Sequence, residues 1–396
     1  MALRITIHGS YGTGNRGDNY ILFQLLGFLE RETPGAEVTV LCRDEERLGA
    51  LLESEFSETS LILRTLHHSF KRRTFAVIKA CMACDMFILG GGGLLWGKAS
   101  GNLGYWLLRL RLAMLAGRKT VIYAPGIFNI QGHRAETLLA RVASKVDFLS
   151  VRDKLGFDIL RAVGVSEQKI FLGADPVFLV PPPDPQRGEE LRKELKLTDR
   201  KIIGLSARDW SGRLSAGLFA RVVAELASDD DTFLIFFALK DSGMPTEVDR
   251  DDTEVGRRLL LTLDPEMQKR MLILDDSTSS EDFMALVSIC DFLIGMRLHA
   301  LIMATLAGVP FGALTYDHKV EAYMAMIGRQ EYLVDRTRFS DPSALDDLVV
   351  ALKALLDQPR SIVQTPIMIA GAEMAGRARA MHQELAARLR DWFPDA

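Results

Sequence analysis

An arginine and a histidine stand two residues apart in IGMRLHALIMATLAG, residues 294–308, where an apolar strand pattern gives way to a helix pattern. The planar guanidinium of Arg297 suits a carboxylate or phosphate, and the free amides of a helix start favour the same anions. His299 adds a group that exchanges a proton near neutral pH. An exposed arginine beside a core histidine is the alternative, but the neighbouring segments favour an anion site with a proton donor.

Two further cations follow strand-like segments in the same half of the chain. Arg208 stands in GLSARDWSG and Lys319 in LTYDHKVEAYM. Ligands of open parallel sheets bind beyond the carboxyl ends of the strands, so we expect both cations beside Arg297. Lys319 also fits a solvated lysine at a helix start.

Glycine-rich segments follow two strand patterns of the first half, in HGSYGTGNRGDNYIL at 8–22 and GGGGLLW at 90–96. Asn15 and Asp18 are candidates for facing a ligand, and Gly91 and Gly92 permit close backbone approach. The alternatives are helix capping by Asp18 and packing of the second loop on the first turn. A dinucleotide site is disfavoured because the Gly-X-Gly-X-X-Gly spacing at Gly12, Gly14 and Gly17 is weak alone, and no clear acidic partner for a ribose follows at the end of the second strand.

Strand and helix patterns alternate through both halves of the chain, which predicts two domains with mostly parallel sheets. PPPDP at 181–185 interrupts the pattern. We expect an α/β fold of two Rossmann-like domains facing across a cleft, with a C-terminal helix returning to the first domain. The expected segments are 1–180, an acceptor-side domain; 181–200, a linker and the start of the second domain; 201–365, a donor-side domain; and 366–396, the helical segment.

Composition narrows the function classes. With 396 residues, the chain is too long for one ordinary hydrophobic core. Its net charge of -4 argues against nucleic acid as a partner. The first residues lack the pattern of a secretory leader, and charged residues interrupt every apolar run, so we expect a cytoplasmic protein without a membrane anchor. Cys81 and Cys84 form a lone Cys-X-X-Cys pair, which favours structural thiols; we expect neither metal nor cofactor.

Seven segments, in order, resemble the polysaccharide pyruvyl transferase family across most of the chain: GSYGTGNRGDNYIL, ILGGGGLL, SVRDKLGFDILRAVG, GADPVFLV, GLSAR, GMRLHALIMA and LTYDHKV. That family resembles GT-B glycosyltransferases in fold. It transfers pyruvate from phosphoenolpyruvate to a sugar of a cell-surface polysaccharide or its lipid-linked precursor, forming a ketal and releasing phosphate. The sequence departs from the family pattern at Asn19, often Glu, and at Gly156, often Ser; the first change concerns acceptor contacts and the second packing.

The resemblance implies roles for the candidate residues. His299 would be the general acid, Arg297 and Arg208 would hold the carboxylate and phosphate of phosphoenolpyruvate, and Lys319 would add positive charge. Asn15 and Asp18, with Gly91 and Gly92, would lie on the acceptor or cleft side. Phosphoenolpyruvate is then a substrate, and no separate cofactor is implied.

Two rival functions share these features. A GT-B glycosyltransferase with a nucleotide-sugar donor would need a carboxylate for the ribose, for which Glu321 is the nearest candidate. A non-enzymatic sensor would keep the anion site without needing His299. A lipid-linked acceptor would bring the protein to the inner membrane face, where basic residues at 69–73 and 109–119 offer contacts, although a solvated helix face is the favoured interpretation of both segments.

Overall fold

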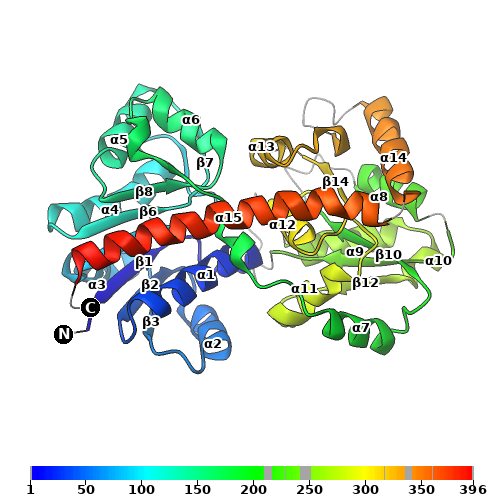
Figure 1. The fold of residues 1–396 in the computed structure, drawn as a ribbon, viewed down its shortest axis with the longest axis horizontal. Helices are drawn as coiled ribbons and strands as arrows, with labels where there is room; N and C mark the ends of the chain where they lie inside the picture. Colours follow the sequence, from blue (N-terminus) through cyan, green and yellow to red (C-terminus); the bar gives the residue numbers. More distant parts are fainter. Residues whose placement is uncertain are drawn as a thin grey trace. The chain divides into compact units, whose positions relative to one another are not determined.

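The computed structural model describes residues 2–208, 216–227, 229–240, 251–315, 317–334, 341–358 and 360–394. The chain divides into two compact units, Met1–Val180 with Met374–Ala396, and Pro181–Glu373. Each unit is built on a parallel sheet with helices on both faces (Figure 1). The α/β class predicted from the alternating pattern is therefore confirmed.

The sheet of the first unit has seven strands in the order β3-β2-β1-β4-β6-β8-β9, and every pairing in it is parallel. The strands are β1 Arg4–His8, β2 Glu37–Cys42, β3 Ile62–His67, β4 Met86–Gly90, β6 Lys119–Tyr123, β8 Phe148–Val151 and β9 Phe171–Leu172. The order reverses between β1 and β4, and such reversals create the crevice where open α/β sheets bind ligands. His8 and Gly90 end the two strands at that point.

Helices of the first unit are α1 Arg16–Glu32, α2 Glu45–Glu55, α3 Phe70–Ala83, α4 Asn102–Leu115, α5 His133–Ala143 and α6 Lys154–Ala162. α3 packs on α4, and α4 on α5. Their apolar sides share one core with the sheet, in which Val77 and Leu107 meet Phe87 and Leu89. A small two-stranded sheet, β5 Leu95–Gly97 with β7 Ile127–Ile130, follows the carboxyl ends of β4 and β6.

The sheet of the second unit has six parallel strands in the order β12-β11-β10-β13-β14-β15. These are β10 Lys201–Ser206, β11 Thr232–Phe237, β12 Met271–Leu274, β13 Phe292–Gly295, β14 Phe311–Leu314 and β15 Leu333–Val334. Its helices are α8 Ala216–Leu226, α9 Asp252–Thr262, α10 Pro265–Gln268, α11 Ser280–Ser288, α12 Leu298–Leu306, α13 His318–Met326 and α14 Pro342–Leu356. The central strands β10 and β13 are mostly apolar because helices cover both of their faces.

The segment expected to be a linker contains a helix, α7 Pro185–Glu194. Asp184 caps it through the Gln186 amide at 2.9 Å, and Pro185 occupies the first turn, where a missing amide hydrogen costs nothing. α7 packs on α11, and Nε of Arg187 donates to Oδ1 of Asp282 at 2.6 Å. The segment 181–184 therefore has no helix or strand, and Pro185 begins a helix of the second unit.

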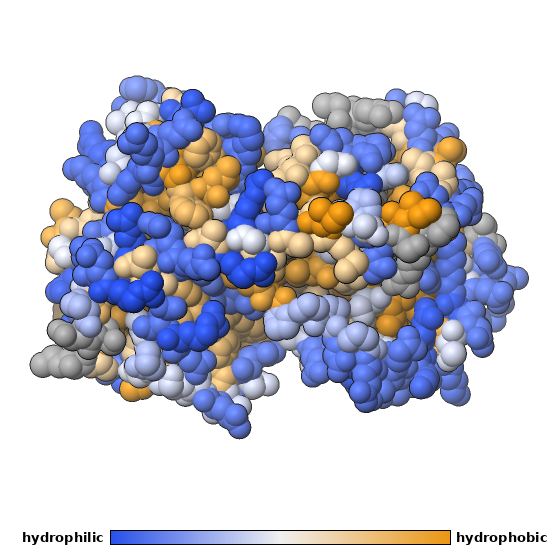
Figure 2. Space-filling view, viewed as in Figure 1, coloured by the Kyte–Doolittle hydropathy of each residue, from blue (hydrophilic) through white to orange (hydrophobic). Residues whose placement is uncertain are grey.

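The last helix, α15 Arg360–Trp392, begins in the second unit and ends in the first. In the first unit, Nε2 of its His382 lies 2.6 Å from the Tyr123 hydroxyl, and the centroid of the His382 ring lies 4.5 Å from that of Phe28. Its earlier turns expose Ile362, Met368 and Ile369, and Figure 2 shows orange patches along the course of the helix.

Candidate functional site

The predicted cations of the second unit lie at the carboxyl edge of its parallel sheet. Arg208 follows β10, Arg297 follows β13 as the N-terminal flanking residue of α12, and Lys319 follows β14 in the first turn of α13. The structure links them through two carboxylates, Asp252 and Asp317. The edge therefore carries a chain of alternating charges.

Arg297 and Asp252 form a two-point ion pair. Nε of Arg297 donates to Oδ2 of Asp252 at 2.9 Å, and Nη2 pairs with Oδ1. The Lys240 amide also donates to Oδ2, at 3.0 Å. Burial raises the pKa of Asp252, while Arg297, Arg208 and the amide favour its ionised form. The guanidinium assigned to the donor from the sequence is thus held in place by a buried acid.

Arg208 connects this ion pair to the next strand, since its charge acts on both Asp252 and Asp317. Asp317 caps α13 through the Lys319 amide at 3.1 Å, and its Oδ2 lies 3.1 Å from Nζ of Lys319. Although burial opposes it, the charges of Lys319 and Arg208 hold the pKa of Asp317 below its usual range. Three cations and two carboxylates of the described residues are thus gathered at one edge of the sheet.

His299 lies in the first turn of α12, two residues after Arg297, with only 9% of its surface exposed. The helix start gives the histidine a fixed position beside the charged edge. The carboxylate considered for a nucleotide ribose, Glu321, pairs instead with Nδ1 of His318 at 3.1 Å. Proton donor and cations therefore come from adjacent strand ends of one sheet.

In the first unit, the glycine-rich loop after β4 packs directly on α1. Asn15 caps α1 by accepting from the Gly17 amide at 3.1 Å, and its Nδ2 donates to Oδ2 of Asp18 at 2.9 Å. A Cβ on Gly92 would stand 2.7 Å from Oδ1 of Asp18, and one on Gly91 would stand 2.1 Å from Cγ2 of Ile21. Asn15, Asp18, Gly91 and Gly92 are thus brought together, and close packing accounts for both glycines.

A buried ion pair that the sequence analysis did not single out lies next to these residues. Nη1 of Arg152 donates to Oδ2 of Asp175 at 2.7 Å, and the guanidinium also acts on Asp18 and Asp153. Asp153 caps α6 through the Gly156 amide at 2.7 Å. The signal was the charged residues that follow strands in SVRD and GADP, but Arg152 and Asp175 are 23 residues apart and their pairing depends on the fold.

An aromatic cluster surrounds the end of β1. The His8 ring is fully buried, with its centroid 4.5 Å from that of Trp106, and burial holds its pKa well below the usual range. The Tyr105 hydroxyl lies 2.7 Å from Nδ1 of His68, and Arg109 donates to the His68 carbonyl at 2.6 Å. This cluster keeps its histidines neutral near pH 7.

Trp96 on β5 is a candidate contact that the sequence analysis quoted without a role. The indole is 40% exposed and stacks on Phe128 of β7, at a centroid distance of 6.3 Å and an angle of 16°. Exposed aromatic faces are apolar surfaces that bind flat ligands at low entropy cost. This pair follows the carboxyl ends of β4 and β6, the edge where a ligand of the first unit is expected.

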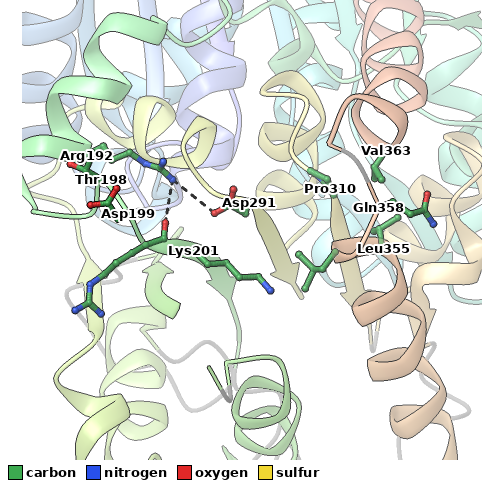
Figure 3. A pocket seen from close by; sticks show the side chains of 11 residues that line it. Arg192, Thr198, Asp199, Lys201, Asp291, Pro310, Leu355, Gln358 and Val363 are labelled. Carbon is green, nitrogen blue, oxygen red and sulfur yellow. Dashed lines mark hydrogen bonds and ion pairs between the residues drawn. The ribbon is translucent and has the colours of Figure 1, made fainter. Parts of the chain in front are cut away.

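A cavity of about 510 Å³ lies at the opposite, amino edge of the second sheet. Figure 3 shows Arg192 and Asp291 turned toward each other there, with 3.9 Å between Nη2 and Oδ2, and Lys201 lining the same cavity. Arg192 also donates to the backbone oxygen of Ile289 at 3.4 Å. The cavity is therefore separate from the charged carboxyl edge.

Other sites receive no support from the described part of the chain. It contains no group of three His, Cys, Asp or Glu side chains placed to hold a metal ion. Cys81 and Cys84 are buried, and burial raises their pKa values to about 12 and about 11. No described helix is long and apolar enough to cross a membrane.

Comparison with known proteins identifies the family. The model of the polysaccharide pyruvyl transferase family matches residues 15–318, which include every candidate residue except Lys319 and Glu321. The chain belongs to this family. It is also 22% identical to the amylovoran biosynthesis protein AmsJ of Erwinia amylovora, over 91% of this chain and 94% of that protein.

Solved structures place this pyruvyl transferase family member in the GT-B fold class. HepE of Anabaena, solved with UDP and glucose, is 13% identical and superimposes with a TM-score of 0.65 over 98% of this chain and all of that one. A glycosyltransferase of Rickettsia africae is 12% identical, with a TM-score of 0.62 over the full length of both. At such identities the similarity concerns the fold alone. The GT-B-like architecture expected from the resemblance is confirmed.

Proposed function

We propose that this enzyme transfers a pyruvyl group from phosphoenolpyruvate to two hydroxyls of a sugar, in a cell-surface polysaccharide or its lipid-linked precursor, and releases phosphate. Family membership supports a transferase that acts on polysaccharide. The observation that carries the finer proposal is the charged edge of the second unit. Arg208, Arg297 and Lys319 gather there around Asp252 and Asp317, with His299 in the first turn of the neighbouring helix.

The proposed reaction begins with proton transfer from His299 to the methylene carbon of phosphoenolpyruvate. The neighbouring carbon becomes electron-poor, and the first sugar hydroxyl adds to it and loses its proton. The bond from this carbon to the phosphate oxygen then breaks, phosphate leaves with the electron pair, and the second hydroxyl closes the ketal. Of the two hydroxyl protons, one replaces the proton that His299 gave to the new methyl group, and the other leaves with phosphate.

The charged edge suits the anionic donor, which carries a carboxylate and a phosphate. Arg208 and Lys319 are proposed to contact these groups, because fixed cations stabilise such charge without reorganising during the reaction. Arg297 is proposed to contact the donor from a position fixed by Asp252. Asn15 and Asp18, with the loop of Gly91 and Gly92, are proposed to shape the acceptor side, and Trp96 to stack on a sugar ring.

The deciding experiment is calorimetric titration of the purified protein with phosphoenolpyruvate. Arg208→Gln should weaken binding at least about tenfold, since a charge-assisted hydrogen bond contributes about 1.5 to 3 kcal/mol. Arg192→Gln is the matched control, because this arginine lines the cavity at the opposite edge of the same sheet. If Arg192→Gln weakens binding and Arg208→Gln does not, the anion binds in the cavity at the amino edge of the sheet, and the proposal is overturned.

A second candidate is transfer from a nucleotide sugar, favoured by the fold that the chain shares with HepE, whose structure contains UDP and glucose. The same titration with a panel of nucleotide sugars separates the two functions. Binding of a nucleotide sugar in place of phosphoenolpyruvate would remove the donor roles proposed for Arg208 and His299.

A further inference from the structure

Two neighbouring helices of the first unit expose large apolar side chains to solvent. On α3, Phe75 is 81% exposed and Met82 38%; on α4, Leu115 is 78% exposed and Leu108 42%. The two helices pack against each other. Exposed apolar residues that stand singly need no explanation, but several on adjacent helices indicate a contact surface.

Helical spacing places these side chains in two stripes. Phe75 and Met82 are seven residues apart on α3, with Lys79 four residues after the first. Residues at such spacings lie on one side of a helix. Leu108 and Leu115 are likewise seven residues apart on α4, and Arg111 lies three residues after Leu108.

The opposite sides of both helices are buried in the core of the unit. Val77 and Cys81 of α3, and Leu103, Leu107 and Leu110 of α4, have no exposed surface. Each helix is therefore apolar on two sides, and only one of them is used by the fold. We call the other the α3–α4 face, made of Phe75, Lys79, Met82, Leu108, Arg111 and Leu115.

The segment that contains α3 and α4 is basic, unlike the protein as a whole. Between Glu58 and Glu136 the sequence has eleven Lys and Arg but one acidic residue, Asp85, while the full chain has a net charge of -4. The carboxylate of Asp85 is bound by Arg4, with Nη2 and Oδ1 2.8 Å apart. Little negative charge therefore remains to offset the basic segment.

The cations of the α3–α4 face are directed to solvent. Lys79 and Arg111 are exposed, and neither makes an ion pair with another described residue. Three more basic residues occur at 71–73 in the sequence, but their side chains, and with them most of the segment 69–73 considered above, lie outside the described part of the structure.

We propose that the α3–α4 face docks on the surface of a bilayer that contains anionic phospholipid, with Phe75 and Leu115 entering the headgroup region. Apolar area together with basic residues gives the two contributions that stable interfacial binding requires. Anionic lipid attracts each Lys or Arg near the surface independently of catalysis, so the proposal does not rest on the proposed reaction. A second copy of this chain is a poorer occupant, because two α3–α4 faces would bring like charges together.

The test is co-sedimentation of the full-length protein with vesicles of phosphatidylcholine alone, or of phosphatidylcholine with 30% phosphatidylglycerol, a composition chosen as about one anionic lipid in three. We expect binding to the anionic vesicles only, and weaker binding as salt rises and screens the charges. The double variant Lys79→Glu with Arg111→Glu should weaken binding about 25-fold or more, from about fivefold for each residue. Arg141→Glu with Lys145→Glu, on exposed basic residues outside the α3–α4 face, is the matched control.

The apolar contribution is tested with Phe75→Glu and Leu115→Glu. Leu261→Glu is the control, since Leu261 of α9 is 76% exposed and belongs to the other unit. Thermal melting of each variant shows whether it is folded. Absence of binding to anionic vesicles, or equal loss in the control variants, overturns the proposal. So does a dimer in sedimentation velocity that Phe75→Glu dissociates, without vesicle binding, because the occupant is then a second copy.

Discussion

Asp252 holds the guanidinium of Arg297 through two hydrogen-bonded contacts, although 45 residues separate them in the chain. The acid is completely buried and belongs to the first turn of α9, while Arg297 flanks the start of α12. The pair therefore joins the residues that follow β11 and β13, and it sets the direction in which Arg297 faces the charged edge.

Removing one member of this pair should destabilise the second unit. Asp252→Asn removes the buried counter-charge of the partly buried Arg297, so we expect the free energy of unfolding to fall by up to about 3 kcal/mol. Urea unfolding followed by circular dichroism measures the change. The double variant Asp252→Asn with Arg297→Gln should lose less unfolding free energy than Asp252→Asn alone. An equal or larger loss would show that the two residues do not act as a pair.

His299→Ala should lower turnover of phosphoenolpyruvate and acceptor by about 10² to 10⁴, because a positioned general acid contributes that much. The dissociation constant for phosphoenolpyruvate should change little, since the cations remain. His318→Ala is the control, as this histidine lies at the same sheet edge but pairs with Glu321. Full turnover by His299→Ala would remove the residue from the mechanism.

The contact between Gly91 and α1 predicts a strong response to a single methyl group. Gly91→Ala would bring a Cβ within 2.1 Å of Ile21, whereas Gly117→Ala, also at positive φ, meets nothing within 4 Å. Both variants carry backbone strain of about 1 to 3 kcal/mol, but only the first adds a clash. Thermal melting should therefore show a clearly larger loss for Gly91→Ala, and similar losses would argue against the packed loop.

Burial lowers the pKa of His382 to about 4, so its folded form is neutral where the unfolded chain takes up a proton. Stability from this group is fully present above the unfolded pKa of about 6.5, and it is lost as the pH falls from there toward 4. The loss amounts to about 3 kcal/mol on the linkage relation. We expect the melting temperature of His382→Gln, which keeps an acceptor for Tyr123, to depend less on pH over this range than that of the wild type.

Trp96 is expected to serve acceptor binding and not donor binding. Trp96→Ala should raise KM for the acceptor about tenfold, consistent with loss of an aromatic stacking contact, while the phosphoenolpyruvate dissociation constant stays the same. Trp96→Phe should restore most of the affinity because it keeps an aromatic face. Equal effects on donor and acceptor would point to disruption of β5 and β7 instead.

The sequence alone determined the two parallel sheets and the edge at which the chemistry is expected. Apolar runs such as KIIGLS and DFLIG, each followed by a polar or glycine-rich loop, are typical of buried parallel strands, and strand ends in such sheets meet at one edge. Arg208, Arg297 and Lys319 could be assigned to that edge without coordinates, because each lies within five residues of a strand end.

Only the tertiary structure decided how these residues are paired. Asp252 stands beyond a segment with no strand or helix pattern, so nothing in the sequence connects it to Arg297, and the pairing of Arg152 with Asp175 likewise depends on which strand ends become neighbours. The packing of Gly91 and Gly92 on α1, and the choice of which side of α3 and α4 stays exposed, are also properties of the assembled core. Local pattern fixes the direction and order of strands and helices, but contacts between distant segments form only when their shared apolar faces are buried together.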